Sequence, residues 1–158
     1  MNKHIINDTF SLQIPEPFES MGAEDLQELS RNGGDPYRWG VRNRDNHVMI
    51  IALWKQYPAL LARISDLKSI VKKNEQLTCK VYEGHDYRLL GFGSLQASDE
   101  KAEGYCFSFS SEGVTQIVSN YLIKDGKTVY AFLCRGLEEN MAADQAMFRE
   151  IMNSLQYL

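Results

Sequence analysis

The sequence predicts an α+β domain in which a twisted antiparallel β-sheet is flanked by helices on both faces, an α/β/α sandwich. Strand patterns joined by hairpin turns dominate, and helical patterns follow the second and last hairpins instead of alternating strictly with strands. Several strands are apolar on both faces, so the sheet needs a layer on each side. No linker or repeat divides the 158 residues, which predicts a single domain, 1–158.

The first predicted elements are a strand and a short helix. Phe10–Ile14 alternates apolar and polar residues, and Pro15-Glu16-Pro17 ends it because proline cannot donate to a β-ladder. A short helix is expected next, with Ser20 as its N-cap. Asn32-Gly33-Gly34 supplies the stop signal for that helix.

A hairpin and a long helix are predicted to follow. Tyr37–Val41 has apolar residues at its odd positions, and the polar segment Asn43–Asn46 predicts a turn. Val48–Trp54 is apolar throughout, which is typical of a strand covered on both faces. From Pro58 onward apolar residues recur at helical spacing, which predicts one amphipathic helix that ends at Asn74.

Further strands are predicted at Leu77–Val81, Arg88–Leu95 and Tyr105–Phe109. Asp125-Gly126 is the favoured dipeptide of a two-residue type I′ turn, and it fixes the register of the hairpin around it. The predicted pairs are Val118 with Leu133, Leu122 with Val129, Ile117 with Cys134, Ser119 with Phe132, and Tyr121 with Tyr130.

The last predicted element is a helix that Asn140 caps. Its apolar residues recur at helical spacing and predict a face that packs on the sheet. They are Met147, Phe148, Ile151, Met152 and Leu155.

Composition and cysteine content exclude several classes of protein. The net charge of −4 argues against nucleic-acid binding, and no apolar run approaches the length of a membrane span. No apolar stretch near the N-terminus has signal-peptide length. Cys79, Cys106 and Cys134 lie in strand-like runs without metal-binding spacing, so we expect free thiols that pack as small hydrophobic groups. A cytoplasmic protein is predicted.

The sequence contains no assembled catalytic motif. Leu90–Ser94 includes Gly-x-Gly but lacks the third glycine and the helix of a dinucleotide site, so we interpret it as a bulge or close approach within a strand. Glu83, His85 and Asp86 resemble metal ligands only locally, and a solvated turn accounts for them better. We predict no catalytic residue, no cofactor, no metal and no enzyme activity.

One alternative is a small-molecule-binding sensor or an uncharacterised hydrolase. His47 and His85 are the only plausible bases in the chain, and Cys106 is a further candidate for the same pocket. Catalysis would need these groups within hydrogen-bond distance of one another or of a bound substrate.

A segment rich in arginine and aromatic residues is the candidate partner-binding site. Such residues are typical of the energetically dominant positions in protein interfaces. The alternative is a purely structural role, in which the aromatic face of a strand packs inward while its arginines are solvated. The candidate residues are Tyr37, Arg38, Arg42 and Arg44.

The whole sequence resembles the PsbP/Mog-type superfamily of small α/β/α sandwiches. Phe10–Phe18 is similar to the first strand of that superfamily and the proline that ends it, and Phe148–Leu155 is similar to its final helix. Members include photosystem-associated subunits, a nuclear-transport factor that binds a Ran-type GTPase, bacterial DcrB-like lipoproteins and Eag chaperones of type VI secretion. The set shares no catalytic residues, so the resemblance implies a non-catalytic domain.

We therefore expect a bacterial, cytoplasmic protein-interaction module, an adaptor or chaperone of the DcrB-like or Eag-chaperone-like branch. It would hold an apolar segment of another protein on the sheet or in a groove, as a monomer or homodimer. No nucleic-acid partner and no membrane insertion are expected. We also expect the helices to cover both faces of the sheet completely, leaving no enclosed polar hollow.

Overall fold

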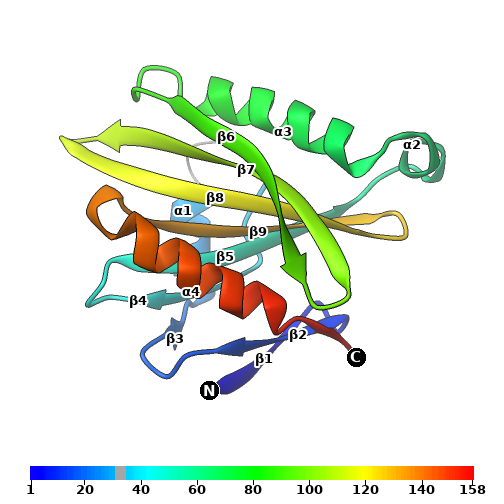
Figure 1. Cartoon of the computed structure of the whole chain (residues 1–158), viewed down its shortest axis with the longest axis horizontal. Coiled ribbons are helices and arrows are strands. Elements are labelled where there is room, and N and C mark those ends of the chain that lie inside the picture. The colour runs from blue at the N-terminus through cyan, green and yellow to red at the C-terminus, as the bar shows by residue number, and fades with distance from the viewer. Residues whose placement is uncertain (31–34) are drawn as a thin grey trace.

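The computed structural model describes residues 1–30 and 35–158, and these contain two antiparallel sheets (Figure 1). The larger is seven-stranded, in the order β3-β4-β5-β9-β8-β7-β6, and the smaller is three-stranded, in the order β1-β2-β10. The strands are β1 (Asn2–Ile6), β2 (Phe10–Ile14), β3 (Glu19–Ser20), β4 (Trp39–Asn43), β5 (Val48–Gln56), β6 (Arg88–Ala97), β7 (Glu100–Ser111), β8 (Val114–Asp125), β9 (Thr128–Leu137) and β10 (Gln156–Tyr157). The helices are α1 (Ala23–Leu29), α2 (Ala59–Ile64), α3 (Leu67–Val81) and α4 (Met141–Asn153).

The large sheet is covered on both faces, which confirms the predicted fold class. On one face α1 and α3 contribute Leu26, Ile70 and Val71 to a core cluster with β5, β7, β8 and β9. On the other face α4 and the small sheet pack against the same strands (Figure 1). Phe10 and Phe148 lie fully within this second cluster. No helix among the described residues is long and apolar enough to cross a membrane.

The predicted strand between two apolar layers is confirmed in β5. Ile50 and Ala52 belong to the cluster on the α4 side, whereas Ile51 belongs to the cluster on the α3 side. β5 pairs with β4 through the turn predicted at residues 43–46, and with β9 on its other edge. α4 begins directly after Asn140. Three residues of the apolar face predicted for it are buried, namely Phe148, Ile151 and Met152.

The single helix predicted from Pro58 to Asn74 is wrong in its extent. Two helices occupy this region, because the Asp66 carboxylate accepts a hydrogen bond from the Ser69 N–H at 2.8 Å and begins α3 as its N-cap. The predicted strand Leu77–Val81 is also wrong, since it is the last part of α3. Leu77 and Val81, the apolar ends of the predicted strand, lie four residues apart, and this spacing fits a helix as well as a strand.

The hairpin between β8 and β9 turns one residue later than predicted. Asp125 pairs with Thr128, and Gly126 has φ of +60°, which fits a turn with Gly at its first central position. Every predicted partner is therefore displaced by two residues, so that Val118 lies opposite Arg135. Because side chains alternate between faces with a period of two, a register shift of two residues leaves each side chain on its predicted face.

The N-terminal region contains structure that the sequence analysis did not predict. β1 and β10 flank β2, so the two ends of the described chain meet in one small sheet. Gly22, not Ser20, is the N-cap of α1, and its N–H donates to the Asp25 carboxylate at 3.2 Å. The stop signal predicted at Asn32-Gly33-Gly34 lies outside the described residues.

Two glycines lie opposite each other in the neighbouring strands β6 and β7. Gly93 pairs with Gly104, and Gly104 in turn lies opposite Tyr121 of β8. A Cβ on Gly104 would collide with the Asn120 carbonyl oxygen and lie 2.8 Å from the Tyr121 Cα, both of them backbone atoms that cannot rotate away. A Cβ on Gly93 would only reach ordinary contact, 3.5 Å from the Tyr121 hydroxyl.

We predict that Gly104→Ala lowers the free energy of unfolding by about 1–3 kcal/mol, because the new methyl group overpacks the β7–β8 contact. Urea denaturation monitored by circular dichroism measures this change. Gly93→Ala is the matched control and should remain close to the parent protein. Equal effects of the two substitutions would contradict the steric explanation.

Candidate functional site

The four predicted partner-binding residues do not form one surface. Tyr37 packs against the core cluster on the α3 side, and burial raises its pKa to about 12. Arg38 instead lies over the ring of Trp54, 5.4 Å from its centroid, and Trp54 packs against the cluster on the α4 side. The sequence analysis expected a strand from Tyr37 to Val41 with its apolar side chains on one face. The strand β4 begins only at Trp39, so Tyr37 lies outside it and does not share a face with Trp39.

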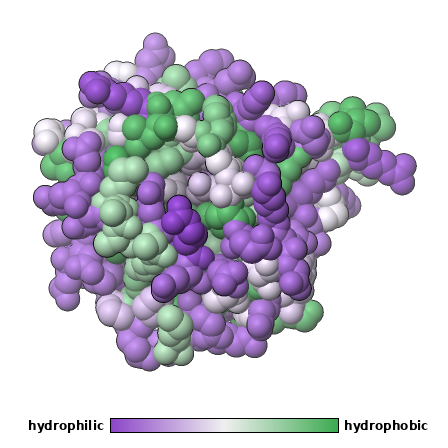
Figure 2. Space-filling model, viewed as in Figure 1, coloured by the Kyte–Doolittle hydropathy of each residue, from purple (hydrophilic) through white to green (hydrophobic). Residues whose placement is uncertain are grey.

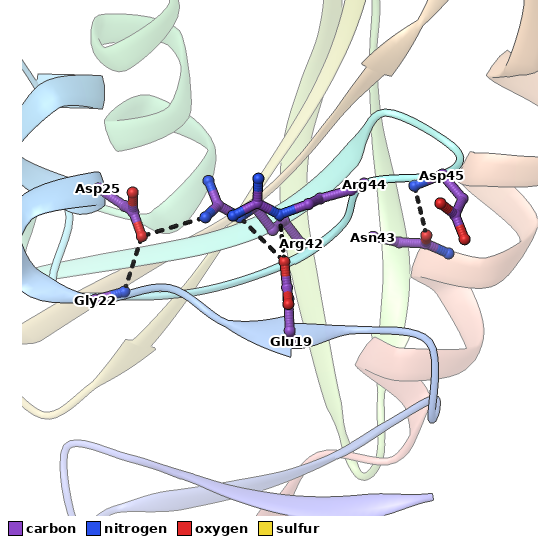
Figure 3. Close-up of polar contacts among 7 residues, drawn as sticks. All are labelled: Glu19, Gly22, Asp25, Arg42, Asn43, Arg44 and Asp45. Carbon is purple, nitrogen blue, oxygen red and sulfur yellow. Dashed lines mark hydrogen bonds and ion pairs between the residues drawn. The ribbon is translucent and has the colours of Figure 1, made fainter.

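Arg42 and Arg44 lie side by side and are paired with carboxylates of the same chain (Figure 3). The Nε atom of Arg44 lies 2.5 Å from Glu19 Oε1, and that of Arg42 lies 3.6 Å from the same oxygen. Arg42 Nη2 also lies 3.4 Å from Asp25 Oδ2. The hydrogen bond from Arg44 is the largest cause of the lowered pKa of Glu19. A partner's carboxylate would have to displace Glu19 to engage both arginines.

The groups considered for catalysis are not brought together. His47 is exposed in the turn between β4 and β5, and His85 is exposed in the turn after α3. Cys106 lies on the face of β7 toward α4, whereas His85 lines a depression on the α3 side with Tyr82 and Arg135. Among residues 1–30 and 35–158, no group of three His, Cys, Asp or Glu side chains could hold a metal ion.

The three cysteines are free thiols, as predicted, but they differ in environment. Cys134 is buried, and Cys106 is partly buried and accepts a hydrogen bond from the Gln145 amide at 3.4 Å. Burial raises the pKa of the Cys106 thiol, so it is not an activated nucleophile. Cys79 is exposed on α3, so the prediction that it packs as a small hydrophobic group in a strand is wrong.

The outer edge of β6 is an exposed apolar surface. β6 is the last strand of the large sheet, and Leu89, Leu90 and Phe92 are 41%, 48% and 50% exposed. Figure 2 shows hydrophobic side chains gathered over the first half of this strand and over α2. Long apolar edges are unusual in isolated domains because their free backbone groups and side chains pair with other chains.

A β-bulge shapes this edge, which confirms the interpretation of the Gly-x-Gly segment. The register shifts between Leu89 and Gly91, and Gly91 has φ of +153°, which glycine tolerates. The extra residue changes the alternation, so Leu89 and Phe92 both pair with residues whose side chains face α3. Leu90 lines a cleft of about 250 Å³ between β6 and α4, and Phe92 borders the same cleft.

A polar network lies beneath α3 and was missed by the sequence analysis. Tyr105 donates to Asn74 Oδ1 at 2.5 Å, and its oxygen lies 2.7 Å from the Thr78 hydroxyl. Asn120 Nδ2 donates to Asn74 Oδ1 at 3.0 Å and to the Tyr105 oxygen at 3.1 Å. The only sequence signal was Asn120, a polar residue between apolar residues on one face of a predicted strand.

Asp144 in the first turn of α4 is held in a poorly solvated position. Its carboxylate lies directly over the Cα of Gly136, where a Cβ would collide with Oδ2. Oδ2 is buried and has no hydrogen-bond partner among the described residues. Burial raises the pKa of Asp144 because the charged form loses solvation.

Comparison with solved structures identifies the fold. No protein-family model and no curated protein matches the chain. The solution structure of cyanobacterial PsbP (CyanoP) from Synechocystis sp. PCC 6803 has a TM-score of 0.68 at 8% identity, over 99% of this chain and 92% of that one. The Ran-binding protein Mog1p of Saccharomyces cerevisiae has a TM-score of 0.60 at 11% identity, over 99% and 95%. LpqN of Mycobacterium tuberculosis, involved in cell envelope biogenesis, has a TM-score of 0.61 at 12% identity, over 94% and 82%.

The chain therefore has the PsbP/Mog-type fold that the sequence resemblance implied. At these identities the similarity shows the fold alone, so no residue role is transferred from these proteins. The DcrB-like or Eag-chaperone-like branch stays a prediction.

We predict that Asp144→Asn makes the protein more stable near neutral pH, because it removes a carboxylate that is costly to ionise in the folded state. The raised pKa means that this cost is absent below the ordinary Asp pKa and appears as pH rises through the folded-state value. The stability difference should therefore shrink as pH falls.

Urea titrations of both proteins across the acid-to-neutral range measure this dependence. Glu139→Gln, at an exposed position just before α4, is the control for a general change in charge. A difference that is independent of pH would contradict the assignment to Asp144.

Proposed function

We propose that this chain is a non-catalytic protein-interaction module, an adaptor or chaperone, that holds an extended apolar segment of another protein against the edge of β6. The observation that carries the proposal is the exposure of Leu89, Leu90 and Phe92 on the last strand of the large sheet. An added strand would pair with the free backbone groups of this edge, and its side chains would cover the apolar ones.

The cleft beside β6 favours a particular kind of segment. Leu90, Phe148 and Met141 contribute apolar side chains to it, Gln145 contributes a polar one, and Arg149 adds a positive charge. Arg149 forms no ion pair within the described part of the chain. An acidic residue at one end of an otherwise apolar partner segment would complement it, and desolvation in the complex would strengthen this contact.

The fold is compatible with this role. Mog1p, which shares the fold, is described as a Ran-binding protein. The unpaired thiols suit a reducing compartment, so we place the proposed module in the bacterial cytoplasm. Of the four predicted residues, Arg42 and Arg44 lie together and stay a proposed secondary contact, and binding there would require both to exchange Glu19 for a partner's carboxylate. Tyr37 and Arg38 are not part of that surface.

A photo-crosslinking amino acid in place of Leu90, introduced in the native host, tests the proposal. We expect a defined protein to be captured, and mass spectrometry of the adduct should map the contact to an apolar segment with an acidic residue. The same amino acid in place of Leu60, an equally apolar but separate surface position on α2, should not capture it.

Binding of the purified partner segment then gives the decisive measurement. Phe92→Ser should weaken it about tenfold or more, since burial of an aromatic side chain is lost, whereas Leu60→Ser should leave it unchanged. Equal weakening by both substitutions, or capture at both positions, would contradict a specific site at β6.

A further inference from the structure

Arg135 of β9 is a half-buried cation on the face of the sheet toward α3. Its Nε atom donates to Gln116 Oε1 at 2.7 Å, and its guanidinium lies 5.0 Å from the centroid of the Phe109 ring. It forms no ion pair with any residue that the structure describes, and residues 31–34 include no Asp or Glu. A charge that is partly withdrawn from water without a counter-charge is costly, so this position favours a bound anion.

Two hollows adjoin at Arg135. One has a volume of about 140 Å³ and the other about 460 Å³, and Val81, Tyr82 and Arg135 border both. The larger one is the depression that His85 lines. Helical cover of this face is therefore incomplete at this place, contrary to the expectation from the sequence. The larger hollow has a volume in the range that is typical of small-molecule sites.

Two tyrosine hydroxyls lie near Arg135 as further donors. Tyr37, Tyr82 and Arg135 line the smaller hollow together. Burial raises the pKa of both tyrosines, to about 12 for Tyr37, and the charge of Arg135 acts on both in the opposite direction. Both hydroxyls therefore stay protonated at neutral pH. Neither hydroxyl and neither Nη group of Arg135 donates to a described residue, and none of these atoms is fully buried, so a ligand can reach them.

The acidic groups near these donors influence which anion fits. Asp35 Oδ2 lies 3.1 Å from Lys55 Nζ, and both residues border the smaller hollow. Glu112 borders the larger hollow from the exposed turn between β7 and β8. These carboxylates repel a ligand with two negative charges more strongly than a ligand with one. The surroundings of Arg135 therefore favour a monoanion.

The donors and walls indicate the chemistry of that anion. The parallel N–H groups of a guanidinium match the two oxygens of a carboxylate, and hydroxyl donors can satisfy the remaining lone pairs. Val81 and Val114 are 37% and 44% exposed and border the larger hollow, where they offer apolar contact to the rest of a ligand.

We propose that the space around Arg135 is a binding site for a small organic monocarboxylate with a short apolar tail. The carboxylate accepts hydrogen bonds from the Nη groups of Arg135 and from the hydroxyls of Tyr37 and Tyr82. The tail lies in the larger hollow against Val81 and Val114. Both hollows are bordered by described residues outside β6, so this site stands or falls independently of the proposed partner binding.

Hexanoate, hexanamide and inorganic phosphate are the probes for this site. Hexanoate and hexanamide share a tail and differ in charge, whereas phosphate is charged and has no tail. Amide NMR titrations of the full chain measure the affinity of each probe. We expect hexanoate to shift the signals of Tyr82, Gln116 and Arg135 with saturation, and to bind about tenfold more tightly than the other two probes. Equal affinities of hexanoate and hexanamide would overturn the role of Arg135, and tighter binding of phosphate would overturn the choice of a monocarboxylate.

Substitutions test the donors one at a time. Arg135→Gln should reduce the affinity for hexanoate about tenfold, to that for hexanamide. Tyr82→Phe keeps the ring that packs on Phe109 and removes only the hydroxyl, so it should reduce the affinity about fivefold even if Arg135→Gln fails to fold. Arg63→Gln and Tyr57→Phe, outside both hollows, are the matched controls and should change nothing. Absence of saturable hexanoate binding, or unchanged affinity in Tyr82→Phe, would overturn the proposed site.

Discussion

The central strands β5, β8 and β9 carry apolar side chains on both faces, so burying one face alone would leave the other in water. At about 25 cal/mol for each Å² of apolar surface, neither face can remain open. The α4 side is closed by a helix together with a small sheet. The α3 side is closed by helices alone.

Much of the architecture follows from alternation and helical spacing. The uniformly apolar Val48–Trp54 predicts a strand between two layers, and the spacing after Asn140 predicts the packed face of α4; both are confirmed. Leu77–Val81 misleads because a five-residue apolar pattern fits both periods, and only the cap at Asp66 reveals where the second helix begins. β1 and β10 depend on pairing with β2 from distant parts of the chain, which no local pattern encodes.

The candidate sites were harder to predict from the sequence than the fold. Counting arginines between positions 31 and 44 could not reveal that Glu19, more than twenty residues from Arg42 and Arg44, is paired with both. The edge position of β6 depends on the order of strands in the sheet, which hairpin signals alone leave open. Asn120 meets Asn74 across 46 positions of sequence, so their network appears only in three dimensions.

The pairing of β2 with both β1 and β10 has a consequence for how the protein is made. β2 is synthesised well before β10, so one of its edges stays open until residues 156 and 157 have left the ribosome. Phe10 and Leu12 must likewise wait for Phe148 and Ile151 before that side of the core can close. This apolar strand is thus exposed until β10 has been made, and holdase chaperones that shield nascent chains would bind there.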